Sequence, residues 1–88
     1  MKLTTKIKNI LAINGLELKN YLELQKNKEA VLIAVKGYSC ALVFASEELK
    51  TNKKVVIEAV KKNGIALQFA SYELRNDEEL NMLALKNL

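Results

Sequence analysis

The sequence repeats itself with a period of 25 residues, and this repeat constrains the fold more than any other feature. Residues 27–51 and 52–76 align without a gap and are identical at 13 of 25 positions. A half unit follows at 77–88, and residues 2–26 form a partial, diverged unit once a gap of one residue is allowed. A unit this short cannot bury its own apolar face, so we expect residues 1–88 to form a single domain of stacked units.

Each unit predicts two short helices. Asn27, Asn52 and Asp77 recur at the repeat period, and their side chains suit the N-cap of a helix. An apolar stripe at i, i+3, i+4 spacing follows the first two of these caps, namely Val31, Ala34 and Val35, and then Val56, Ala59 and Val60. The apolar positions of the second, shorter helix are Ala41, Leu42, Ala45 and Leu49, and then Ala66, Leu67, Ala70 and Leu74.

These patterns predict an all-α fold, a small array of short helix-turn-helix repeats packed as a compact, solenoid-like helical bundle. No segment shows the sustained alternation of a β-strand. Asn14-Gly15 and Asn63-Gly64 mark expected helix ends, where glycine is predicted to take the left-handed conformation. Helices of about ten residues are only about 15 Å long and marginal alone, so packing between units must hold them.

The composition excludes several kinds of chemistry. The chain has no His, so it offers neither a Ser–His or Cys–His nucleophile pair nor an imidazole ligand for a metal. Its single cysteine, Cys40, rules out an internal disulfide and a thiolate cluster, and we expect it to be a small buried hydrophobe. The sequence therefore predicts a protein that is not an enzyme, with no catalytic residues, no cofactor and no metal.

Hydrophobic segments long enough for a membrane are missing from the sequence. No run reaches 18 apolar residues. Residues 1–13 loosely imitate a signal peptide, but Lys6, Lys8 and Asn9 interrupt the apolar positions. We therefore expect a cytoplasmic protein without a membrane partner.

The two full units differ at positions that suggest a binding surface. Three positions that are apolar or aromatic in unit 27–51 are polar in unit 52–76, with Ile33 matching Glu58, Tyr38 matching Asn63 and Val43 matching Gln68. One interpretation is that the N-terminal helix covers the apolar residues, through Leu3, Ile7, Ile10 and Leu11. The other is an exposed apolar patch that binds a partner.

Positive charge is concentrated in one stretch of the chain. The net charge is +4, and the basic residues between 50 and 62 are Lys50, Lys53, Lys54, Lys61 and Lys62. Lys53 and Lys54 fall in the first turn of a helix, where the macrodipole disfavours cations. The stretch predicts either contact with an acidic partner or with phosphates, or an ordinary solvated lysine face. Tyr72 beside Arg75 adds two residue types that are common at interfaces.

The sequence also resembles a known repeat family. The residues that carry the resemblance include Asn63, Gly64, Ala66, Leu67, Phe69, Ala70, Ser71, Glu73 and Leu74, with Asn27, Glu29, Val31, Leu32, Ala34, Val35 and Lys36 in the preceding helix. They resemble DUF4116, a domain of unknown function found in bacteria, protists and viruses. The resemblance implies tandem short helices and an interaction role, and it supplies no catalytic residues. Gly37-Tyr38-Ser39 and Asn81 depart from the pattern, so we expect a different turn at Tyr38.

Taken alone, the sequence favours a non-enzymatic protein-interaction module, a stand-alone adaptor or an inhibitor that binds a larger protein. A nucleic-acid-processing enzyme is one such partner, as for a mobile-element inhibitor of a host defence nuclease. The alternative is a helical domain that binds nucleic acid directly through Lys50–Lys62. The helix after Asn63-Gly64 lacks the polar side chains that read base edges, which disfavours that alternative.

Overall fold

The computed structural model describes residues 2–88, and within them it contains helices and no strands. The all-α prediction is therefore confirmed. The α-helices are α1 (Thr5–Ile13), α2 (Lys28–Gly37), α3 (Glu47–Lys50), α4 (Lys53–Lys62), α5 (Tyr72–Arg75) and α6 (Glu78–Lys86). The 3-10 helices are η1 (Gly15–Asn20), η2 (Leu22–Lys26), η3 (Ser39–Phe44) and η4 (Gly64–Phe69).

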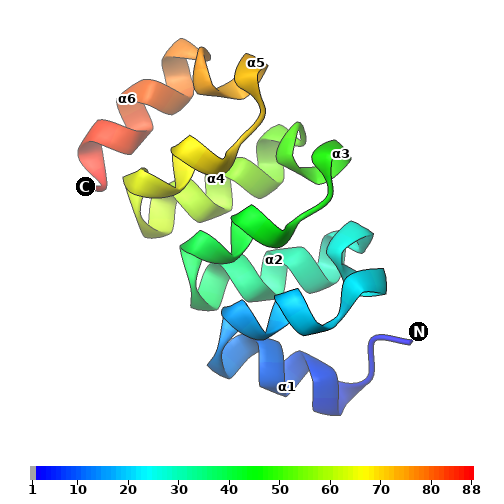
Figure 1. Ribbon diagram of the computed structural model, residues 1–88. Helices are drawn as coiled ribbons and strands as arrows, with labels where there is room; N and C mark the ends of the chain where they lie inside the picture. Colours follow the sequence, from blue (N-terminus) through cyan, green and yellow to red (C-terminus); the bar gives the residue numbers. More distant parts are fainter. Residues whose placement is uncertain (1) are drawn as a thin grey trace.

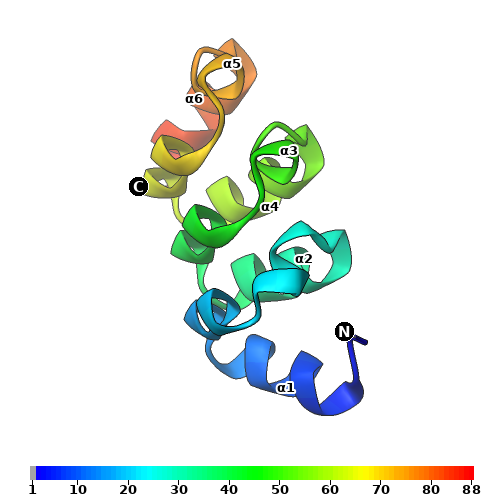
Figure 2. The ribbon, with the colours of Figure 1, turned by 45° about the vertical axis from the view of Figure 1, so that its right-hand side comes forward.

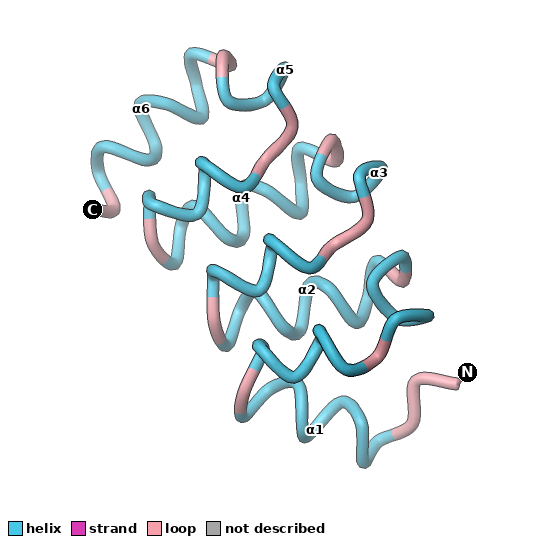
Figure 3. The backbone as a smooth tube through the Cα atoms, viewed as in Figure 1, coloured by secondary structure: helices cyan, strands magenta, loops and turns pink. Residues whose placement is uncertain are grey.

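The helices form two layers that step along one direction (Figures 1 and 2). The helices α1, α2, α4 and α6 lie side by side in what we call the α layer. The 3-10 helices, with the one-turn helices α3 and α5, form the 3-10 layer in front of it (Figure 3). The array measures 36 × 22 × 16 Å, and α1 and α6 lie at its opposite ends.

The predicted caps and stripes form the framework of each unit. The side chains of Asn27, Asn52 and Asp77 accept the backbone N–H groups of Ala30, Val55 and Leu80, respectively. The stripe residues of α2 and α4 are fully buried between the layers, namely Val31, Ala34, Val35, Val56, Ala59 and Val60. Leucines of the 3-10 layer, including Leu18, Leu42 and Leu67, pack against them from the other side.

The second helix of each unit is not continuous, which corrects the sequence-based expectation. It consists of a six-residue 3-10 helix and a one-turn α-helix, separated at Ala45-Ser46 and again at Ala70-Ser71. Ser46 caps α3 by accepting the N–H of Leu49, and its own N–H donates to the carbonyl oxygen of Gln25 in the preceding unit at 2.8 Å. That bond takes an N–H which a continuous helix would use internally, so packing between units breaks the helix.

Glycine has a different role from the one predicted. No described glycine has a positive φ, so none closes a helix in the left-handed conformation. Gly15 and Gly64 instead face the backbone of the next helix in the α layer. A Cβ added at Gly15 would lie 2.1 Å from the carbonyl oxygen of Ala34, and one at Gly64 would lie 2.0 Å from that of Ala84. Close approach between units requires glycine here.

The turn at Tyr38 has nearly the same backbone as its counterpart, so the expectation of a different turn is wrong. Its φ and ψ are −149° and 103°, against −159° and 121° at Asn63. The difference lies in the cap, since Asn63 accepts the N–H of Ile65 and Tyr38 makes no side-chain cap bond. Ser39 follows Tyr38 and is buried where Gly15 and Gly64 lie in the other units.

Gly64→Ala should lower the free energy of unfolding by about 1–3 kcal/mol, because the new methyl group overpacks a rigid carbonyl and moves α6 away from η4. Gly64 also donates its N–H to the carbonyl oxygen of Asn87 at 2.9 Å, and that bond would stretch. Urea unfolding followed by circular dichroism measures the loss. Gly37→Ala is the comparison variant: its Cβ would lie 2.7 Å from the backbone carbonyl oxygen of Ala12, which is also too close but less so, and alanine has the higher helix propensity, so its loss should be smaller. Equal losses in both variants would contradict the close-approach argument.

Candidate interaction surfaces

The lysines between 50 and 62 do not form one surface. Lys50 pairs with Glu47 at 3.5 Å, and Lys61 pairs with Glu58 at 3.6 Å. Lys53 pairs with two carboxylates of the next unit. Among residues 2–88, no carboxylate lies within 4.0 Å of Lys54 or Lys62. The predicted basic stretch is thus divided between ion pairs inside the chain and two lysines that are free to contact a partner.

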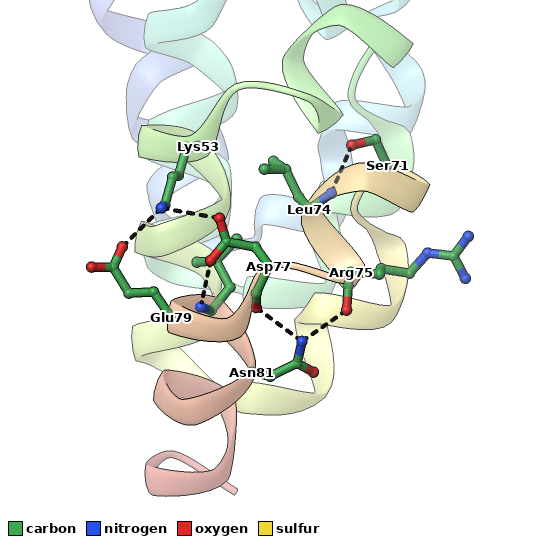
Figure 4. A network of polar contacts seen from close by, with 8 residues as sticks. Lys53, Ser71, Leu74, Arg75, Asp77, Glu79 and Asn81 are labelled. Atoms are coloured by element: carbon green, nitrogen blue, oxygen red, sulfur yellow. Dashed lines mark hydrogen bonds and ion pairs between the residues drawn. The ribbon is translucent and has the colours of Figure 1, made fainter.

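Lys53 has a structural reason for its place in the first turn of α4. Its Nζ lies 3.0 Å from Oδ2 of Asp77 and 2.9 Å from Oε1 of Glu79, both near the start of α6 (Figure 4). The two contacts raise the pKa of Lys53, that to Glu79 more than that to Asp77. The carboxylates offset the unfavourable dipole of α4, so the broken local rule is explained for Lys53 and not for Lys54.

Asn81 replaces the buried valines of the earlier units because its surroundings differ. Val31 and Val56 are fully buried, whereas Asn81 is exposed, since no segment of the described chain covers this face of α6. Its amide donates to the backbone carbonyl oxygens of Arg75 and Asp77, both at 2.9 Å (Figure 4). The departure from the repeat thus joins α5 to α6.

Ile33, Tyr38 and Val43 do not gather into one patch. Glu29 pairs with Lys8 of α1 at 3.0 Å, and Ile33 lies one turn further along the same face of α2, half-buried beside α1. Val43 belongs to the other layer, where 39% of its surface is exposed, and Tyr38 is 46% exposed just before η3. The N-terminal helix therefore covers the face that carries Ile33 and leaves Val43 open.

The open residues of the 3-10 layer form a second grouping, which includes one residue that sequence reasoning missed. Residues three apart eclipse in a 3-10 helix, so Cys40 and Val43 share the outward row of η3, and Ile65 and Gln68 share that of η4. Cys40 is half-buried and not buried as predicted, because it lies on this row. Ile65 is 51% exposed. The sequence patterns did not single out Ile65, because it does not lie on an α-helical apolar stripe. We call Tyr38, Val43 and Ile65 the 3-10 face.

Tyr72 and Arg75 lie together at the edge of the 3-10 layer, as their spacing predicts. The Arg75 guanidinium carbon lies 5.9 Å from the centre of the Tyr72 ring, which is cation–π distance. Tyr72 is 74% exposed. The pair is open to a partner, and it is separate from the lysines of α4.

Two grooves run along the outside of the α layer, and the residues that line them were largely missed by sequence reasoning. The groove between α2 and α4, of about 510 Å³, is lined by Lys28, Leu32, Lys36, Lys54, Ile57 and Glu58. The groove between α4 and α6, of about 740 Å³, is lined by Ile57, Lys61, Glu78, Glu79, Met82, Leu83 and Lys86. The signal in the sequence is the i, i+4, i+8 spacing of Lys28, Leu32 and Lys36, which places them on one helix face.

The loss of folding stability at acid pH should depend on Asp77. The N–H of Leu80 and then Lys53 hold the pKa of its carboxyl below the usual value. Stability from such a group is complete above its unfolded pKa of about 3.9 and is lost as the pH falls through the lower folded pKa. Asp77→Asn keeps an N-cap residue and removes the charge. We therefore expect lower stability at pH 7 and a shallower fall between about pH 5 and 2.

Urea unfolding at a series of pH values measures this dependence. Glu78→Gln is the control, because it removes a charge from the same turn of α6 without touching the pair with Lys53. Parallel curves for Asp77→Asn and the unmodified chain would show that the ionised carboxylate of Asp77 contributes nothing to stability.

Comparison with known proteins finds one family model that is similar to part of the chain. No helix of residues 2–88 is both long and apolar enough to cross a bilayer, and the same residues hold no group of three or more potential metal ligands. Neither curated proteins nor solved structures give a match. Residues 52–87, which run from the cap of α4 to the end of α6, match the model of the family described as "Domain of unknown function (DUF4116)". The match over these residues confirms the expected resemblance to the DUF4116 family.

Proposed function

We propose that this chain is a non-enzymatic protein-interaction module, which acts as an adaptor or as an inhibitor by covering a larger partner protein. The observation that carries the proposal is the 3-10 face. Val43 and Ile65 are apolar and exposed on η3 and η4, which contact each other, and Tyr38 is exposed just before η3. Covering apolar surface of this kind stabilises a complex by about 25 cal/mol per Å² removed from water.

The repeat itself supports a binding role for this face. At the equivalent positions, unit 52–76 has Asn63 where unit 27–51 has Tyr38, and Gln68 where it has Val43. The backbone at Tyr38 and Asn63 is nearly the same, so the fold accepts a polar residue there. Tyr38 lacks the cap hydrogen bond that an asparagine makes at this position. A partner that covers its exposed ring would account for tyrosine in place of asparagine.

Direct binding of nucleic acid remains the alternative, and the ion pairs count against it. Lys50, Lys53 and Lys61 each lie within 4.0 Å of a carboxylate of this chain, so phosphate contacts would compete with existing partners. The net charge of +4 is modest for binding driven by phosphates. A protein partner that itself processes nucleic acid fits the proposal equally well.

We further propose that the module works in the cytoplasm. Cys40 is a free thiol, half-buried on the outward row of η3 beside the 3-10 face. A free, partly accessible cysteine next to a binding surface suits a reducing compartment, where it does not form mixed disulfides.

Val43→Gln, which copies the residue of the following unit, should reduce capture of the partner and change the stability by no more than about 0.5 kcal/mol. The measurement is affinity capture from nuclease-treated extract with quantitative mass spectrometry, at low and at high salt. An apolar interface should lose little at high salt, whereas phosphate contacts weaken steeply.

Lys19→Gln, an exposed substitution on η1, is the matched control and should capture the same proteins as the unmodified chain. Ile33→Glu provides the opposite case, since Ile33 is half-buried beside α1 and its loss should lower stability first. If Val43→Gln captures the same proteins in the same amounts, the 3-10 face is not the binding surface.

A further inference from the structure

Two of the three interfaces between neighbouring helices in the α layer are joined by an ion pair. Between α1 and α2, Nζ of Lys8 lies 3.0 Å from Oε2 of Glu29. Between α4 and α6, Lys53 contacts Asp77 and Glu79 at 3.0 and 2.9 Å. In both interfaces, a lysine of the earlier helix meets an acidic residue in the first turn of the later helix. Opposite charges therefore face each other across both of these interfaces.

The interface between α2 and α4 breaks this pattern. Lys28 stands at the repeat position of Lys53, but the positions of Asp77 and Glu79 are occupied by Asn52 and Lys54. Lys28 and Lys54 thus line the same groove with charges of the same sign. Among residues 2–88, neither has a carboxylate within 4.0 Å. The chain thus places two positive charges where its other interfaces bring opposite charges together.

The groove beneath these lysines has the features of a peptide-binding site. Leu32 and Ile57 are half-buried and line it between Lys28 and Lys54 on one side and Lys36 on the other. Its one acidic residue, Glu58, is already paired with Lys61. The volume of about 510 Å³ holds several side chains. An apolar floor with unneutralised lysines at its rim is complementary to a segment that carries both leucine-like and acidic side chains.

We propose that the groove between α2 and α4 binds an acidic segment of a partner protein, with an apolar side chain on Leu32 and Ile57 and carboxylates at Lys28 and Lys54. The proposal deepens the role of the chain as a protein-interaction module and rests on it, but it concerns the opposite layer from the 3-10 face. A protein segment fits better than RNA, because none of the six lining residues is aromatic and none is Arg.

The test uses the intact chain and a fluorescein-labelled peptide of twelve residues, made of Asp and Glu with two leucines four residues apart. Fluorescence anisotropy at low salt measures its affinity. We expect binding that weakens at least fivefold in Lys54→Glu and changes less than twofold in Lys19→Glu, which alters the net charge equally on the other layer. A peptide with both leucines replaced by serine should bind several-fold more weakly.

The thermal stability of Lys54→Glu separates lost binding from lost structure. The substitution recreates at Lys28 the arrangement of Lys53 and Glu79, so Tm should rise by about 1–5 °C while binding falls. A drop in Tm would show that Lys28 does not pair with the new carboxylate, and it would overturn the argument that like charges face each other across this groove. Val43→Gln should bind the peptide as the unmodified chain does, so a failure of the 3-10 face and a failure of this groove give different results.

Three results of the binding measurements would also overturn the proposal. No binding by the unmodified chain shows that the groove does not take acidic segments. Equal weakening in Lys54→Glu and Lys19→Glu shows attraction by net charge alone. Tighter binding of an oligouridine of equal charge, lost in Lys54→Glu, assigns the groove to RNA instead.

Discussion

The close approach of consecutive α-layer helices to the 3-10 layer is the constraint on which the rest of the structure depends. Gly15 and Gly64 lie so near the carbonyls of Ala34 and Ala84 that a methyl group has no room. Helices of nine or ten residues are marginal alone, so their stability comes from this contact between units. The small residues and short connections of the repeat follow from it, because a wider spacing would leave the valine stripes partly open.

The sequence predicted those features that depend on neighbours along the chain. The caps at Asn27, Asn52 and Asp77 and the buried stripes appear as expected, because a cap needs only the next three residues and a stripe only helical spacing. The break at Ser46 was missed, because it depends on Gln25 in the preceding unit. The reason for Gly64 was missed likewise, because Ala84 lies twenty residues away. Both of these features depend on a contact between units.

In the candidate surfaces too, the sequence predicted single residues but not their arrangement in space. Comparison of the units identified Tyr38 and Val43, which are exposed, but it grouped them with Ile33, which lies in the other layer beside α1. A comparison of aligned positions finds residues that differ, and it does not show on which layer they lie. Ile65 was overlooked for the related reason that the outward row of a 3-10 helix has a period of three, which the search for α-helical stripes does not detect.

Lys53 and Lys54 show how far local rules extend. Both lysines lie in the first turn of α4, where the helix dipole disfavours them equally. Lys53 reaches forward to the acidic turn of α6 and is neutralised, whereas Lys54 lines the groove toward α2 together with Lys28. Only the second leaves charge available to another molecule. In a repeat protein, an unfavourable residue therefore indicates binding only after the neighbouring unit has been shown not to compensate it.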